Sequence, residues 1–145
     1  MALIEAERAM DAGEIPVGAV IVANGQIIAR GYNLTERLHD FTAHAEMQAF
    51  TAATEYLGGK YLDQCTLYVT LEPCPMCAGA AFWTRIGKIV YGATDEKRGY
   101  NRFQQKLHDE HVLHPKTIVK GGVMEAECAA LLKEFFQKRR QQRLN

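Results

Sequence analysis

The feature that most constrains this 145-residue chain is a pair of short motifs, His44-Ala45-Glu46 and Pro73-Cys74-Pro75-Met76-Cys77. The gap between them is typical of one intervening helix and one strand. One imidazole and two thiolates are three of the four ligands of tetrahedral zinc, and three protein ligands with an open position are typical of catalytic zinc. The sequence therefore predicts that the fold brings these two segments together around a zinc ion, with water in the fourth position.

The spacing within each motif supports a catalytic role. Cys74 and Cys77 share one helix face if Pro75 occupies the first turn, where its missing N–H costs nothing. Free N–H groups and the helix dipole would also favour thiolate over thiol there. Glu46, two residues after the histidine, is placed to take a proton from the water and hand it on. We expect Glu46 to be catalytic and the site to add hydroxide to a substrate.

A closed structural zinc site is the alternative reading of the same residues. Cys65, Cys128 or His39 would then supply the fourth ligand, and Glu46 would be an ordinary surface carboxylate. An isolated C-x-x-C is a weak signal, whereas H-x-E followed at this distance by P-C-x-x-C is specific. We therefore favour the open, catalytic site.

Length and composition indicate one domain over residues 1–145, long enough to bury a core. No run approaches the roughly 18 apolar residues of a membrane span. The first residues carry an acidic Glu5 where a signal peptide would be basic, so we expect a cytoplasmic protein. Cys65 and Cys128 stand in apolar patterns and are expected as buried thiols in a reducing compartment.

The formal net charge is zero, so the protein as a whole would not attract nucleic acid and any RNA site must be a local patch. The strongest basic cluster is 138–143 at the C-terminus. It fits either an RNA contact or a solvated last helical turn whose cations suit the dipole.

Hydrophobic periodicity predicts a helix over 3–12 and then a hairpin. Its strands are expected at 17–23 and 26–32, joined by Asn24-Gly25, the strongest two-residue hairpin signal. Thr42 is a plausible N-cap for a helix that carries His44 and Glu46 in its first turn and ends at Gly58-Gly59.

Strands alternate with helices in the remainder, which predicts a largely parallel α/β sheet after the hairpin. We expect strands at 66–71, 88–93 and 117–120, and continuation of the second motif as a helix to Thr84. The last helix shows an apolar stripe formed by Cys128, Leu131, Leu132, Phe135 and Phe136.

The segment 97–115 is the least regular part of the sequence. It begins with basic and aromatic residues and then carries His108, His111 and His114. A second metal site is one interpretation. We favour a polar surface loop, because no carboxylate or cysteine is fixed beside these histidines.

With these residues in view, the chain resembles the bacterial tRNA-specific adenosine deaminases of the cytidine-deaminase superfamily over nearly its whole length. The zinc motifs alone indicate only the superfamily. The similar stretches are 13–20, 29–33, 42–47, 66–80 and 127–136. The narrower match depends on Pro16-Val17-Gly18, Asn33, the run 71–79, Asp95 and the ending from Phe135-Phe136 to Arg139-Arg140.

The resemblance implies a three-layer αβα fold around a five-stranded mixed sheet, with the zinc motifs at two helix N-termini. It implies conversion of adenosine to inosine at the wobble position of a tRNA anticodon, by a homodimer holding one zinc per subunit. His44, Cys74 and Cys77 would bind zinc, and Glu46 would shuttle protons. Asn33 would contact the base, Asp95 a flanking nucleotide, and Arg139 and Arg140 the RNA. Val17, Val69 and Ala45 would line the base pocket.

The chain departs from the family at three places. Phe41 stands where the family often has proline. The loop 97–115, with its basic and histidine content, stands in place of a short Gly-Ser-containing loop, and His114 is the nearest histidine to the Asn-His pair that the family has before the fifth strand. The family also usually has several more residues before the position of Met1, so we expect a truncated first helix.

Two other functions remain open at this point. A deaminase of free guanine, cytosine or deoxycytidylate would use the same zinc centre. Tight, salt-sensitive tRNA binding would discriminate against it. A non-catalytic zinc module that binds RNA or a protein would lack an open coordination position with Glu46 in reach.

Overall fold

The computed structural model describes residues 1–144, which form a mixed five-stranded sheet in the order β2-β1-β3-β4-β5. β1 is antiparallel to both β2 and β3, whereas β3, β4 and β5 are parallel. This arrangement confirms the predicted hairpin followed by parallel strands. The strands are β1 Gly18–Ala23, β2 Gln26–Tyr32, β3 Cys65–Leu71, β4 Lys88–Ala93 and β5 Ile118–Lys120.

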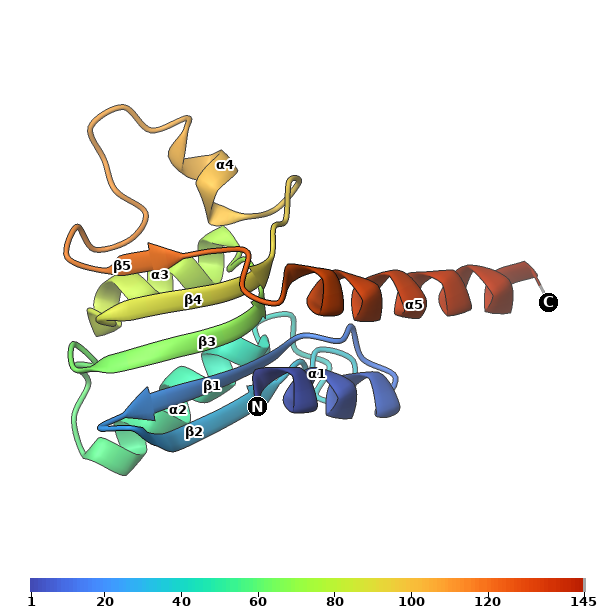
Figure 1. Ribbon diagram of the computed structural model, residues 1–145, viewed down its shortest axis with the longest axis horizontal. Helices are drawn as coiled ribbons and strands as arrows, with labels where there is room; N and C mark the ends of the chain where they lie inside the picture. The colour runs from blue at the N-terminus through green and yellow to red at the C-terminus, as the bar shows by residue number, and fades with distance from the viewer. Residues whose placement is uncertain (145) are drawn as a thin grey trace.

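Helices cover both faces of the sheet (Figure 1). A side chain on Gly18 would overlap the backbone of the first helix, whereas one on Gly31 would overlap the start of the second. Gly31 pairs with Ala19, the neighbour of Gly18, and successive strand residues point to opposite faces. The predicted three layers are therefore confirmed. The helices are α1 Ala2–Asp11, α2 Ala45–Leu57, α3 Pro75–Thr84, the short α4 Tyr100–Gln104, and α5 Glu125–Leu144.

The larger part of the core lies between the sheet and the pair α2 and α3. Ile21, Leu67 and Ile89 from three neighbouring strands are fully buried there, together with Ala49 and Ala78 from the two helices. The small alanines let the helices approach the sheet closely. This packing sets the two helix N-termini beside each other.

The close contact at Gly31 determines where α2 begins. A Cβ at Gly31 would overlap the carbonyl oxygen of Ala45, the first residue of α2. The glycine therefore allows the helix start to lie directly against the end of β2. His44, the residue before Ala45, is positioned by this contact.

The predicted N-cap of α2 is wrong by two residues. His44 is the N-cap, with extended dihedrals of φ −71° and ψ 157°. The Thr42 N–H and hydroxyl both donate to the Asp40 carboxylate, at 2.8 and 2.7 Å. This local turn uses the Thr42 hydroxyl before the helix begins, so it is not available to cap the helix.

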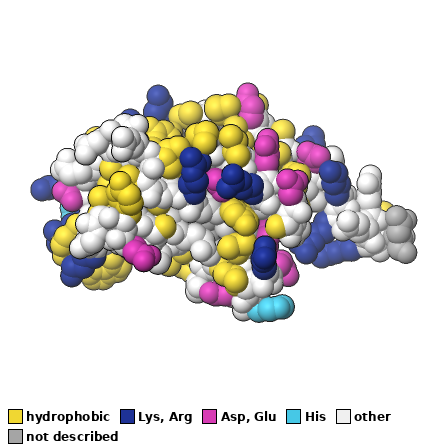
Figure 2. All heavy atoms as spheres, turned by 90° about the horizontal axis from the view of Figure 1, so that it is seen from below, with side chains coloured by type: hydrophobic (Ala, Val, Ile, Leu, Met, Phe, Trp, Pro, Cys, Tyr) yellow, Lys and Arg dark blue, Asp and Glu magenta, His cyan; other side chains and the backbone are white. Residues whose placement is uncertain are grey.

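The last helix packs over only part of its length. Cys128 and Phe135 are buried, whereas Phe136, expected in the same apolar stripe, is 43% exposed. The reason is that α5 runs beyond the edge of the sheet (Figure 1), so its second half has no layer to pack against. Figure 2 shows Lys and Arg side chains near this projecting end, which carries Lys138, Arg139, Arg140 and Arg143. None of the helices within residues 1–144 has the length and apolar character needed to cross a membrane.

Candidate active site

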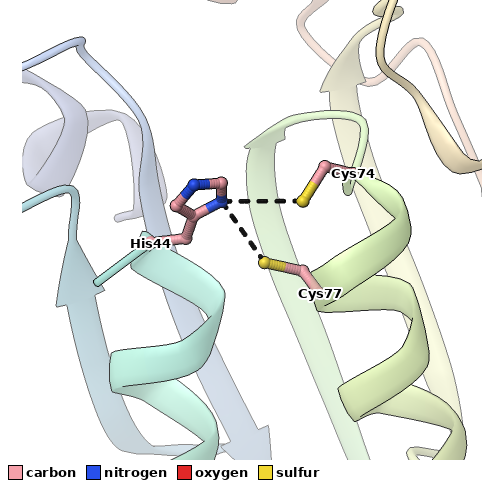
Figure 3. Close-up of side chains that lie close together, drawn as sticks. All are labelled: His44, Cys74 and Cys77. Carbon is pink, nitrogen blue, oxygen red and sulfur yellow. Dashed lines mark hydrogen bonds between the residues drawn. The ribbon is translucent and has the colours of Figure 1, made fainter. Parts of the chain in front are cut away.

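The two sequence motifs meet at the N-termini of α2 and α3 (Figure 3). β3 ends at Leu71, and Cys74 then serves as the N-cap of α3 with Pro75 at the first helical position. Pro75 has no N–H to lose and its fixed φ suits a helix start. Cys77 lies in the first turn, so both sulfurs face His44 across the gap between the helices. The placement of both motifs at helix starts is confirmed.

The three predicted metal ligands have distances suited to zinc. The Nδ1 atom of His44 lies 3.6 Å from the Sγ of Cys74 and 3.5 Å from the Sγ of Cys77. Tetrahedral zinc, with bonds of about 2.0–2.1 Å to nitrogen and 2.3 Å to sulfur, separates these two atom types by about 3.6 Å. The donor set and its geometry therefore fit a zinc ion.

The candidates for a fourth protein ligand lie elsewhere. Cys65 is buried at the opposite end of β3, Cys128 packs on β4, and His39 is exposed on the loop before α2. Within residues 1–144, the group of His44, Cys74 and Cys77 includes no fourth His, Cys, Asp or Glu. The arrangement favours an open site over a closed structural one.

Hydrogen bonding within the cluster prepares it for a cation. A hydrogen bond from Cys77 and a further one from His44 lower the pKa of Cys74 to about 4 despite burial. The pKa of Cys77 is raised, because it holds the proton shared with Cys74 and is itself buried. The bond to Cys74 raises the pKa of His44. The cluster thus concentrates negative charge on sulfur, the form that binds metal.

Glu46 lies in the first turn of α2 and is only 4% exposed. Burial raises the pKa of its carboxyl group to about 7, with a further contribution from the nearby Cys74. A carboxyl group with a pKa near neutrality can both accept and donate a proton at working pH. The environment of Glu46 is therefore suited to proton transfer beside the metal ligands.

A small cavity of about 160 Å³ opens beside these groups. It is lined by the predicted residues Val17, Asn33, Ala45 and Asp95 together with His44, Glu46 and Cys74. The structure also has cavities of about 310 and 530 Å³. The first lies between α1 and α5 and the second beside Trp83, and both are away from His44, Cys74 and Cys77. The small cavity is the one in which chemistry at the cluster can take place.

Asn33 is held in a defined orientation at the cavity wall. Its Nδ2 donates to the carbonyl oxygen of Ile15 at 3.4 Å, and its Oδ1 accepts from the backbone N–H of Thr35 at 3.3 Å. The following loop is tied down by Glu14, a fully buried carboxylate that accepts from the N–H groups of Glu36 and Arg37, both at 2.9 Å. These contacts keep Asn33 beside Val17.

Val69 does not take the position expected of it. It is 3% exposed and packs in the core under α2 and α3, and the cavity wall is formed by Leu71 instead. Leu71 lies on the same face of β3 but two residues nearer the strand end, where the cavity opens. On this strand the apolar wall of the cavity is therefore Leu71, one pleat nearer the strand end than Val69.

Arg139 and Arg140 lie on the projecting part of α5 and do not line the cavity. The guanidinium of Arg139 is 5.3 Å from the centre of the Phe135 ring. In the loop 97–115, His108 and His111 are exposed, and His114 lies against Phe82 with ring centres 5.8 Å apart. Part of this loop forms the short helix α4, which was not expected from the sequence.

Four cavity residues were not singled out from the sequence as site residues: Ile15, Leu71, Glu72 and Arg98. Glu72 had a usable signal, because it stands at the end of a strand directly before the metal-binding motif. Arg98 is in the basic stretch after Asp95, but its position at the cavity depends on the contacts of this segment with Glu72, which lies more than twenty residues earlier in the chain.

Sequence comparisons identify the chain as a deaminase. The family model described as MafB19-like deaminase matches residues 1–140. The tRNA-specific adenosine deaminase of Bacillus subtilis is 45% identical over 142 residues, covering 98% of this chain and 88% of that protein. The chloroplastic tRNA(adenine(34)) deaminase of Arabidopsis thaliana is 44% identical over 95% of this chain, which spans only 12% of that longer protein.

Solved structures agree with the sequence comparisons. A structure from a study of A-to-I editing by tRNA:A34 deaminases matches with a TM-score of 0.82 and 43% identity, covering 90% of this chain and 95% of that one. A guanine deaminase from Bacillus subtilis matches with a TM-score of 0.63 and 35% identity, covering 96% and 89%. The zinc-type cluster, the cavity and these matches together show that the chain belongs to the family of tRNA-specific adenosine deaminases.

Proposed function

We propose that this protein converts adenosine to inosine at position 34, the wobble position, of a tRNA anticodon. The observation that carries the proposal is the single cavity in which His44, Cys74, Glu46 and Asn33 meet. The Bacillus subtilis tRNA-specific adenosine deaminase is 45% identical over 98% of this chain, which supports this choice of substrate. The net reaction takes up water at C6 of adenine and releases ammonia.

His44, Cys74 and Cys77 would hold one zinc ion per subunit, since their spacing suits tetrahedral coordination. When bound, zinc supplies Lewis acidity that makes water nucleophilic at neutral pH. The three ligands would also keep the reaction centre at the N-terminal ends of α2 and α3, next to the carboxyl group of Glu46.

Glu46 would carry the protons of the reaction. Its carboxylate accepts a proton from the attacking water and delivers one to N1 of adenine, the ring nitrogen beside C6. It then takes the second proton from the oxygen that is now bonded to C6 and donates it to the departing amine, so that the C–N bond breaks, C6 becomes a carbonyl and ammonia leaves. A pKa of about 7, raised by burial, suits a group that must act as base and acid in one cycle.

The remaining cavity residues would recognise the flipped base. Asn33 presents an oriented amide to its polar edge, while Val17, Ala45 and Leu71 contact its flat faces. Asp95 lies at the cavity wall, where a nucleotide flanking the target would lie. Arg139 and Arg140 on α5 would contact RNA further from the target, because they lie outside the cavity.

We also propose that the protein acts as a homodimer in the cytoplasm. Trp83 is 77% exposed and Tyr61 45% exposed beside a hollow that Phe82 and Arg85 also line. Large aromatic side chains exposed together commonly mark a protein interface. A second copy of this chain would bury this face.

Deamination of a free base is the second candidate function, because a guanine deaminase shares the fold at 35% identity. A direct test incubates zinc-loaded protein with unmodified tRNA that carries adenosine at the wobble position, and reads inosine by sequencing. Free adenosine, guanine and cytosine are assayed in parallel. Inosine at that one position supports the proposal. Inert tRNA with a deaminated free base would replace it with the second function, and inactivity on every substrate would indicate a binding module.

A further inference from the structure

The cavity contains one cation that the proposed chemistry leaves without a role. Glu46, Glu72 and Asp95 line it as carboxylic acids, and Arg98 is the single Lys or Arg on its wall. We propose that Arg98 binds the backbone phosphate next to the target adenosine and so selects a nucleotide within RNA over a free base. This inference rests on the proposed function and extends it to a named substrate contact.

Arg98 belongs to a turn ordered by Asp95. The carboxylate oxygen Oδ1 of Asp95 accepts from the N–H groups of Lys97 at 3.2 Å and Arg98 at 3.0 Å. The carbonyl oxygen of Asp95 accepts from the N–H of Gly99 at 2.9 Å. Three backbone donors within four residues are therefore satisfied by one aspartate, which fixes where the Arg98 side chain leaves the main chain.

Glu72 attaches this turn to the neighbouring motif at residues 73–77. This carboxylate is 3% exposed and accepts from the N–H groups of Asp95 and Asn101, both at 3.1 Å. A Cβ on Gly99 would overlap the Glu72 carboxylate, so the absence of a side chain at this position lets the backbone pass close to Glu72. The carbonyl oxygen of Pro73 also accepts from the N–H of Tyr100 at 2.8 Å. Arg98 is thus positioned by the same segment that carries Cys74.

The guanidinium of Arg98 has no ion-pair partner among the described residues. Within residues 1–144 the ion pairs are Arg8–Glu5, Arg30–Glu5 and Lys138–Glu134. Arg98 is exposed at the cavity although the carboxylate of Asp95 lies three residues away. An arginine left without a partner beside a binding cavity suits an external anion, and its planar donors match a phosphate.

A phosphodiester is the anion that the proposed substrate brings to this place. A target base that enters the cavity keeps its flanking phosphates at the entrance, because they are joined to it through the ribose. Apart from the proposed metal ligands His44 and Cys74 and the neutral amide of Asn33, the other groups on the wall are acidic or apolar, so Arg98 is the cation placed to attract a phosphate. A free base has no phosphate, so a contact at Arg98 would favour RNA.

The test measures affinity for an anticodon stem-loop RNA by fluorescence anisotropy, in the Glu46→Gln background so that the RNA is not consumed. We expect Arg98→Gln to weaken binding about tenfold and to lower the slope of log affinity against log salt by about 1. Arg98→Lys should recover part of the affinity. Lys106→Gln, which removes one charge from the same loop outside the cavity, is the matched control. Equal effects of Arg98→Gln and Lys106→Gln would overturn the proposal.

A neutral methylphosphonate placed at each linkage beside the target locates the contact. We expect one such linkage to weaken binding to the Arg98-containing protein about tenfold and to cause no further loss in Arg98→Gln. If, at both linkages, the loss of affinity caused by the methylphosphonate multiplied with the loss caused by Arg98→Gln, the proposal would be overturned. Inosine formation by the wild-type protein on the same stem-loop is measured separately. Its absence would contradict the proposed function, while the affinity comparison still decides the role of Arg98.

Discussion

In the proposed reaction Glu46 and the three proposed metal ligands carry the chemistry, and each depends on its immediate surroundings. Burial gives Glu46 a pKa near 7, whereas hydrogen bonds from Cys77 and His44 keep Cys74 as a thiolate. The acid and the thiolate lie within one cavity, yet their environments shift their pKa values in opposite directions. Substitutions at Glu46 and Cys74 should therefore separate proton transfer from metal binding.

Replacement of Glu46 by glutamine should abolish turnover and leave the metal in place. The amide keeps the shape of the side chain but cannot accept a proton, so we expect a loss of about a thousandfold or more in single-turnover rate. Zinc content, measured by elemental analysis, should stay at one ion per chain. Activity close to that of the wild type would refute the assignment of Glu46.

Cys74→Ala should instead remove the metal. The variant lacks one of three protein ligands, and we expect zinc to be lost on dialysis and activity with it. Cys65→Ala is the control, since Cys65 is buried in the core away from the cluster. Circular dichroism verifies that both variants are folded. Equal zinc retention in the two folded variants would rule out Cys74 as a ligand.

Two elements carry proposed site residues in different ways: α2, which lies closely on the sheet and carries Glu46, and α5, which extends beyond the sheet and carries Arg139 and Arg140. The first contact depends on Gly31, where any side chain would overlap the start of α2. The second depends on a helix that packs only in its first half, leaving arginines on the part that projects (Figure 1).

Gly31→Ala should destabilise the protein. The added methyl group forces α2 away from β2, and we expect a loss of about 1–3 kcal/mol in the free energy of unfolding. Gly59→Ala is the control, because a Cβ there meets open space and φ lies outside the left-handed region. It should change stability by less than about 0.5 kcal/mol. Chemical denaturation measures both. Equal stability of the two variants would contradict the packing described for α2.

The projecting half of α5 is predicted to bind RNA backbone. Replacing Arg139 and Arg140 by glutamine together should lower the salt slope of tRNA affinity by about 2, because each phosphate contact contributes about 1. The control removes two charges elsewhere: Lys116→Gln lies just before the exposed strand β5, and Lys120→Gln lies at its end. If both double variants change the slope equally, the helix has no specific role and only net charge matters.

At the scale of the whole molecule, the exposed aromatic side chains of Trp83 and Tyr61 are proposed to be covered by a second copy of the chain. A charge introduced within a homodimer interface would be costly to bury. We therefore expect Trp83→Glu to convert a dimer into a monomer, as measured by multi-angle light scattering. Trp83 is 77% exposed, so the substitution should leave the subunit folded. Phe41→Glu, at a residue 90% exposed on the loop before α2, should remain dimeric. A wild-type monomer would contradict the dimer proposal.

Most local structure could be predicted because it depends on near neighbours in the chain. Asn24 and Gly25 both have positive φ and form the predicted hairpin turn, and Pro75 starts a helix as expected. The N-cap of α2 could not be predicted from the pattern, since Thr42 prefers a turn with Asp40 and the sheet contact at Gly31 selects His44.

The sequence by itself determined the chemistry of the site. A histidine, two cysteines and a glutamate in this spacing have few other uses, because ligand type and helix geometry are local properties. Only the tertiary structure decided what surrounds them. Burial tuned Glu46, the strand end placed Leu71 rather than Val69 at the cavity, and Glu72 brought Arg98 to its wall. These features arise from contacts between segments far apart in the chain, which no local pattern records.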